Sequence, residues 1–276
     1  MKKYTHLLKF LVISFLLFCA CEKENSIITP PIINTNVDCK PLQTRYVFYS
    51  WSIVTGNQRH ESISDFIYEN GQLKSKVLSD EINDSRREEV FFYEGELLDS
   101  IKATSTVSDG TNLIKYTYDD QNRIVDAINL NRNSSGEILD TNMHIKMVYG
   151  NAGFEQINFV NSDSYHRVYK SPITHNVDST RRFHASGPTN TLGVYEYDDN
   201  KRIYSNLPFY GLKTWSSFSK TSTNNATRYT LFENTIYDVI SEFLYNDHGF
   251  PIQRINFRSS NPVLHDTLYI EYTNCD

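Results

Sequence analysis

The chain has 276 residues, with 33 acids against 27 lysines and arginines, and a formal net charge of −6. Residues 1–20 hold three lysines and no acid, so without them 24 basic residues face 33 acids and the net charge is −9. This balance lacks the basic surface that binds nucleic acid by counterion release, so we expect no nucleic-acid partner. The 19 tyrosines and 16 phenylalanines, with only 11 glycines, favour paired β-strands over helices.

The first twenty residues have the pattern of an export signal. Three lysines form a basic start, and the apolar run at 10–18 is far shorter than the ~20 residues that a membrane-spanning helix needs. The small residue Ala20 then precedes Cys21. This arrangement resembles the lipobox of bacterial lipoproteins, which implies cleavage before Cys21, lipidation of that cysteine and attachment to a membrane. An ordinary secretory signal without a lipid is the alternative.

Residues 21–38 follow as the lipidated cysteine and a tether. Their sequence contains Pro30-Pro31 and several asparagines, a composition typical of flexible linkers. The charged residues directly after Cys21 are similar to the short tract that directs Bacteroidota lipoproteins to the cell surface. We therefore expect a lipid-anchored protein of the outer membrane, on the cell surface rather than the periplasmic face, with one β-domain over 39–276.

Two cysteines remain in the expected domain, Cys39 at its start and Cys275 as the penultimate residue. An even pair in an exported protein indicates a disulfide. Two free thiols are one alternative. Metal-binding thiols are another, although no Cys-x-x-Cys or histidine spacing accompanies them. We favour the disulfide and expect no metal.

A repeated segment runs through the domain. Each copy has an aromatic or apolar residue, any residue, a tyrosine, a turn-forming cluster and then an apolar position. The tyrosines are Tyr68, Tyr93, Tyr118, Tyr149, Tyr197, Tyr245 and Tyr272. They are 25, 25, 31, 48, 48 and 27 residues apart, so each gap of 48 is expected to contain a degenerate unit.

Each unit has room for two strands and two turns. Side chains alternate along a strand, so a segment such as Tyr116-x-Tyr118 places both rings on one face. Asp, Asn and Gly then form a tight turn, and apolar alternation resumes. The segment 235–247 also alternates and is predicted to be a strand.

The repeat resembles the YD repeat of Rhs-type wall proteins. Together with the lipobox and tether, it resembles Bacteroidota lipoproteins of unknown function that have a porin-like fold. The resemblance implies an all-β antiparallel meander of hairpins, strongly twisted into an open sheet or a partly closed barrel. Charges interrupt both faces, as in the segment 73–81, so we expect a soluble domain rather than a membrane barrel. Regions 155–190 and 208–232 lose the repeat and are expected to be loops or insertions.

Candidate catalytic and metal-binding groups have simpler explanations. The pairs Asp119-Asp120 and Asp198-Asp199 suggest an acid–base couple or calcium ligands, yet they stand where turns require such residues. His166, His175 and His184 are nine residues apart, but scattered surface histidines are the default. No nucleophile elbow, phosphate loop or dinucleotide motif occurs. We therefore expect no cofactor and no enzyme activity.

The aromatic residues give the remaining candidates. The repeat tyrosines are expected to pack in the sheet, because the repeat requires them everywhere. Non-periodic aromatics are better candidates for a ligand, and they are Trp51, Phe209, Tyr210, Trp215 and Phe218. The sequence thus predicts a binding or scaffolding domain whose partner is a glycan or an envelope protein. A glycan-binding accessory lipoprotein is the alternative function.

Overall fold

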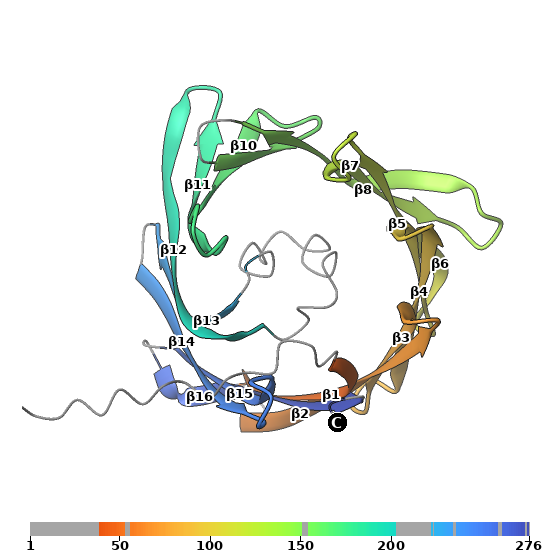
Figure 1. Cartoon of the computed structure of the whole chain (residues 1–276). Helices are drawn as coiled ribbons and strands as arrows, with labels where there is room; N and C mark the ends of the chain where they lie inside the picture. The colour runs from red at the N-terminus through yellow and green to blue at the C-terminus, as the bar shows by residue number, and fades with distance from the viewer. Residues whose placement is uncertain are drawn as a thin grey trace, which may run out of the picture. The chain divides into compact units, whose positions relative to one another are not determined.

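A computed structural model describes residues 39–276 except 53–55, 151–153, 203–221, 223, 234–235, 259–260, 274 and 276. Within this part the chain forms sixteen strands joined in a closed barrel (Figure 1). The strands are β1 (Lys40–Ser52), β2 (Gly56–Glu69), β3 (Gln72–Asp80), β4 (Ser85–Glu94), β5 (Leu97–Ser105), β6 (Ser108–Tyr118), β7 (Ile124–Arg132), β8 (Ile138–Tyr149), β9 (Phe154–Phe159), β10 (Ser164–Lys170), β11 (Val177–His184), β12 (Gly187–Lys201), β13 (Asn224–Phe232), β14 (Ile236–Tyr245), β15 (Pro251–Arg258) and β16 (Asn261–Thr273). Among the described residues there is no helix long and apolar enough to cross a membrane.

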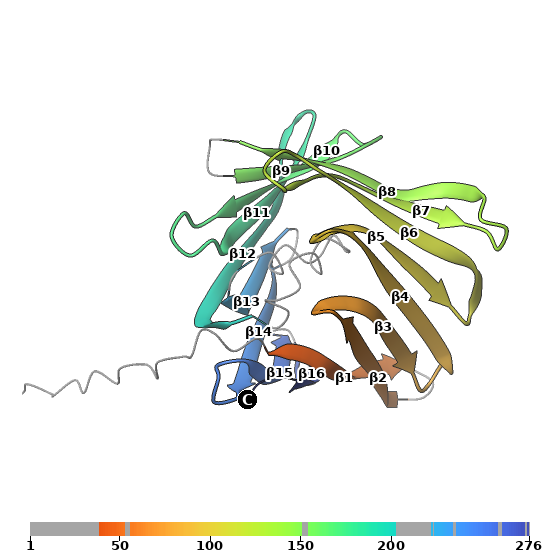
Figure 2. The ribbon, with the colours of Figure 1, turned by 45° about the vertical axis from the view of Figure 1, so that its right-hand side comes forward.

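Each strand pairs antiparallel with its neighbours in sequence, and Figure 2 shows β3 to β8 side by side in chain order. The predicted all-β antiparallel meander is confirmed, including the strand expected in 235–247. The expectation of an open or partly closed sheet is wrong, because β1 also pairs with β16, from Lys40 opposite Thr273 to Val47 opposite Thr267. Closure gives both end strands a partner for their backbone hydrogen-bonding groups.

The two faces of the wall differ in burial. On β4, Phe91 is 4% exposed while Phe92 is 43% exposed. Inward side chains of a barrel converge and outward ones diverge, so the buried face is the interior. The buried residues of β2 to β11 form one continuous cluster: Phe66, Leu73, Phe91, Leu98, Ile101, Ile114, Tyr116, Ile124, Ala127, Ile145, Met147, Ile157, Phe159, Val168 and Val177.

Five of the repeat tyrosines bond one hairpin to the preceding one. Each of these five stands near the end of an even-numbered strand, and its hydroxyl donates to a backbone carbonyl at the start of an odd-numbered strand. The bonds are Tyr93 to Leu73 (3.1 Å), Tyr118 to Leu98 (2.7 Å), Tyr149 to Ile124 (2.8 Å), Tyr197 to Val177 (2.9 Å) and Tyr272 to Pro251 (3.0 Å). Several of these rings also pack against the core cluster. This geometry supports the structural interpretation of the repeat tyrosines.

The turn between β2 and β3 has the residues that the sequence pattern predicts for a tight hairpin. Asn70 and Gly71 connect β2 to β3 with φ angles of 51° and 82°. Both values are positive, as the tightest hairpin turns require, and Asn-Gly is the residue pair that adopts them at low cost.

The regions without the repeat are only partly as predicted. The prediction of a loop or insertion is wrong for most of region 155–190, which belongs to β9, β10, β11 and the start of β12. On β10, Val168 and Lys170 stand at the two positions where the other copies of the repeat have an aromatic or apolar residue and the tyrosine. The alternation of inward and outward side chains therefore continues on this strand without the tyrosine. In region 208–232, residues 224–232 form β13, which pairs directly with β12 and β14, so no extra hairpin enters the barrel there.

The predicted disulfide is present. Cys39 and Cys275 are bonded, with their Cα atoms 4.7 Å apart. Cys39 immediately precedes β1, and the first residue pair of the closing seam is Lys40 with Thr273. The disulfide therefore joins the two ends of the domain at the seam that closes the barrel.

Candidate functional site

Most of the predicted ligand-binding aromatics are not placed by the structure. Phe209, Tyr210, Trp215 and Phe218 lie outside the described residues, and so does the predicted lipidation site, Cys21. Trp51 belongs to the end of β1, but its side chain is not among the described ones. The predictions for these residues stay predictions.

The first aspartate pair, Asp119-Asp120, lies in the turn between β6 and β7, where the two carboxylates have different surroundings. Asp119 accepts hydrogen bonds from the backbone amides of Gln121 (3.0 Å) and Arg123 (2.9 Å), and from the Arg123 guanidinium. The bonds to Arg123 hold the pKa of Asp119 below its usual value. Asp120 is exposed beside it. The two carboxylates therefore have different surroundings, and Asp119 stabilises the turn.

The second pair is divided in a similar way. Asp198 accepts from the backbone amides of Asn200 (3.0 Å) and Asn225 (3.3 Å), and from the hydroxyl of Tyr245. Burial, together with the hydrogen bond and charge of Asp198, raises the pKa of Tyr245. Asp199 is exposed. These contacts connect β12, β13 and β14 and do not form a pair of facing carboxylates.

The three evenly spaced histidines are not brought together. His166 is on the interior face of β10, where burial and Arg182 lower its pKa to about 4. His175 is in the turn before β11, and His184 is the last residue of β11. No group of three or more metal-ligating side chains gathers among the described residues.

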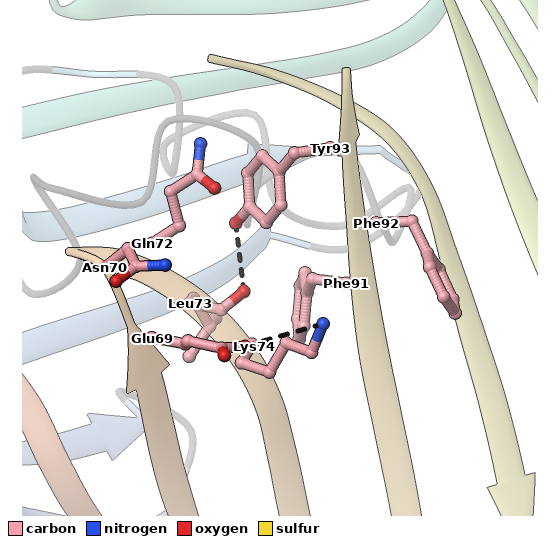
Figure 3. A pocket seen from close by; sticks show the side chains of 8 residues that line it. All are labelled: Glu69, Asn70, Gln72, Leu73, Lys74, Phe91, Phe92 and Tyr93. Atoms are coloured by element: carbon pink, nitrogen blue, oxygen red, sulfur yellow. Dashed lines mark hydrogen bonds and ion pairs between the residues drawn. The ribbon is translucent and has the colours of Figure 1, made fainter. Parts of the chain in front are cut away.

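A small pocket of about 250 Å³ lies between the β2–β3 turn and β4 (Figure 3). It is lined by Glu69, Asn70, Gln72, Leu73, Lys74, Phe91, Phe92 and Tyr93. Phe91 and Tyr93 project from one side of β4 and Phe92 from the other (Figure 3). Its polar contacts are structural: Tyr93 donates to the Leu73 carbonyl, and Lys74 lies 3.7 Å from Glu69 in an exposed ion pair. Such a pair adds little stability.

A second surface, on the outward face of β9, β10 and β11, has a more distinctive composition. The strand registers arrange nine side chains in three rows of three: Phe154, Tyr169 and Ser179; Gln156, Arg167 and Arg181; Asn158, Tyr165 and Phe183. We call these nine residues the aromatic–arginine surface. The side chains of the opposite face on the same strands, such as Ile157 and Val168, belong to the buried cluster.

Arg167 is the centre of this surface. Its guanidinium carbon is 4.5 Å from the ring centre of Phe154 and 4.7 Å from that of Phe183. Tyr165 stacks on Phe183 with ring centres 5.1 Å apart and planes 3° apart, and Phe154 is 5.8 Å from Tyr169. Cation–π contacts at both rings hold the Arg167 side chain in place.

The charges on this surface are all positive. Arg167 lies directly opposite Arg181 in the register, and the nine residues include no acid. Sequence reasoning missed the surface, because its residues come from three strands in a region expected to be irregular. The motif Tyr165-x-Arg167-x-Tyr169 was the available signal, since period-two spacing puts its three side chains on one face.

Comparisons with known proteins add a distant likeness in fold. No protein-family model and no curated protein match the chain. One solved structure that it resembles is a porin-like protein from Bacteroides uniformis ATCC 8492, with 8% sequence identity and a TM-score of 0.36. The match covers 84% of this chain and 96% of that chain. No function is transferred from a likeness of this degree.

Proposed function

We propose that the chain is a lipid-anchored protein of the bacterial outer membrane, on the cell surface, whose β-barrel binds a ligand rather than catalysing a reaction. The observation that carries the binding function is the aromatic–arginine surface, where two arginines and four aromatic rings face outward without an acid. Aromatic residues and arginine are the types enriched in protein–protein interfaces.

The disulfide supports export. Bonds of this kind persist in oxidising compartments outside the cytosol. The link between Cys39 and Cys275 is consistent with the export signal expected in residues 1–20. The lipobox-like sequence ending at Cys21 supports a lipid anchor for the exported chain.

The outward face of the barrel supports a water-soluble wall. Many of its strands carry charged residues between buried neighbours, for example Lys115 between Ile114 and Tyr116. The outward charged residues of β5 to β8 and β11 to β14 include Lys102, Lys115, Asp126, Lys146, Arg181, Glu196, Arg228 and Glu242. Each lysine or arginine on the lipid face of a membrane barrel costs about 2–4 kcal/mol at the bilayer midplane. We therefore infer that the lipid on Cys21, and not the barrel, attaches the protein to the membrane.

Metabolic labelling with an alkyne fatty acid tests the anchor. The native chain should incorporate the label, and a Cys21→Ser variant should incorporate none. A Cys39→Ser, Cys275→Ser variant is the matched control, since it also replaces cysteines by serine but keeps Cys21 and should label as the native chain does. Equal labelling of native protein and the Cys21→Ser variant would refute the lipid anchor.

A further inference from the structure

We propose that the aromatic–arginine surface is a binding site for an acidic sugar, a pyranose carrying a carboxylate or sulfate group. Arg167 and Arg181 would bind the anionic group, and the flanking rings would contact the apolar faces of the sugar. This inference rests on the proposed binding function and names the ligand class.

The state of Arg167 is the first argument. Its guanidinium lies against Phe154 and Phe183, and its Nε donates to Gln156 Oε1 at 3.4 Å. Among the described residues, its two terminal nitrogens make no hydrogen bond or ion pair. A planar guanidinium fixed by rings, with its terminal donors available, is the arrangement that binds a carboxylate or sulfate through two hydrogen bonds.

The facing arginines are the second argument. Like charges directly opposite each other on neighbouring strands destabilise a sheet. Arg167 and Arg181 are such a pair, in a chain that is acidic as a whole. On the outward face of β13, by contrast, Arg228 has an acid beside it, Asp238 at 2.8 Å. An anionic ligand would supply the counter-charge that Arg167 and Arg181 lack on this surface.

The rings and the dimensions favour a sugar over a simple anion. Rows two residues apart on a strand are roughly 7 Å apart and strands about 5 Å apart, so the surface spans roughly 10 by 14 Å. That area matches one or two pyranose rings. Tyr165 and Tyr169 flank Arg167 along β10, and they offer apolar ring surface that a sugar would contact and a small inorganic anion would not. The exposed side chain of Val194, opposite Ser179 on β12, extends the apolar margin.

Titration calorimetry on the purified full chain in mild detergent tests the proposal. The probes are oligogalacturonate and chondroitin sulfate oligosaccharides, a neutral cello-oligosaccharide of equal length, sodium sulfate, and glycerol 3-phosphate as a soluble lipid headgroup. We expect binding to at least one acidic oligosaccharide, weakened by salt, and none to the neutral sugar. Arg181→Gln, at an exposed position that spares the fold, should weaken binding by about tenfold or more.

Two further variants make the test specific. Arg167→Lys keeps the charge but removes the planar fork, so binding should weaken at unchanged net charge. Arg86→Gln, at an exposed position of β4, removes the same charge as Arg181→Gln and should bind as the native chain does. No binding to either acidic oligosaccharide, or equal losses in Arg86→Gln and Arg181→Gln, would overturn the proposal. Binding to glycerol 3-phosphate or to sulfate but not to the oligosaccharides would also overturn it, and would assign the surface to lipid headgroups or to simple anions. The lipid-labelling result on Cys21 is independent of all these outcomes.

Discussion

Removing the disulfide should loosen the barrel at its closing seam. The change is the double substitution Cys39→Ser, Cys275→Ser, which leaves no unpaired thiol at either position. In the native chain the bond links the residue before β1 to the end of β16, and these two strands close the ring. Among the strand pairs, β1 and β16 are also the two strands that lie farthest apart in the sequence.

The magnitude follows from the sequence separation of 236 residues. In the chain-entropy model, a loop of that length lowers the entropy of the unfolded chain by about 18 cal/mol/K, which is ~5 kcal/mol at 25 °C. This is an upper value, and removing a native disulfide typically costs roughly 2–5 kcal/mol. For a domain of this size, each kcal/mol corresponds to about 2–4 °C in Tm. We expect Tm to fall by roughly 5–15 °C.

Calorimetry and hydrogen exchange together check this reasoning. Tm is measured for the native chain, the double variant and the native chain with a reductant, and the last two should agree. Amide protection should decrease most at β1 and β16, and β5 to β8 should change less below the melting transition. A Tm within 2 °C of the native value would refute the argument, and so would a uniform loss of protection around the ring.

Three other changes give distinct results. Tyr118→Phe removes one hydroxyl bond between hairpins and should lower the free energy of unfolding by about 0.5–1.5 kcal/mol in denaturant titration. Gly193→Ala should cost about 1–3 kcal/mol in the same assay, since a Cβ there would lie 2.7 Å from the Thr180 hydroxyl oxygen. Burial and Arg182 lower the pKa of His166 to about 4, so between the unfolded value near 6.5 and pH 4 the folded chain binds fewer protons than the unfolded chain. Stability should therefore fall as the pH drops through that range, and His166→Gln should flatten the dependence of Tm on pH. An unchanged dependence of Tm on pH in His166→Gln would contradict the role given to His166. A free energy of unfolding equal to the native value in Tyr118→Phe or in Gly193→Ala would contradict the reasoning for that variant.

Much of the wall could be predicted from the sequence because its signals are local. Alternation and turn residues around Tyr68, Tyr93 and Tyr118 predict hairpins, and a long series of hairpins is a meander. Closure of the ring could not be predicted, because it depends on the number, tilt and stagger of all strands together. Cys39 and Cys275 placed the two ends of the domain together but did not indicate that β1 and β16 pair.

The candidate site was harder to predict because strand register creates it. Phe154, Arg167 and Phe183 are distant in sequence, and only the pairing of β9, β10 and β11 brings the two rings to the two sides of the guanidinium. The composition of the whole chain also gave no sign of this surface. A net charge of −6 is a sum over all residues and does not reveal two neighbouring arginines without an acid beside them. Because β10 lacks the repeat tyrosine, the sequence pattern predicted a loop in this region and gave no indication of a binding surface.

The most direct test of the account is whether the barrel needs a membrane once its anchor is removed. Residues 1–21 are replaced by a cleaved secretory signal that carries no lipidation site, and the exported chain is partitioned between detergent and aqueous phases. We expect a folded, disulfide-bonded monomer in the aqueous phase without detergent, because the outward wall carries charges such as Lys102, Lys115 and Lys146. A chain that stays in the membrane and enters only the detergent phase would contradict it, and would mean that the barrel itself crosses the bilayer.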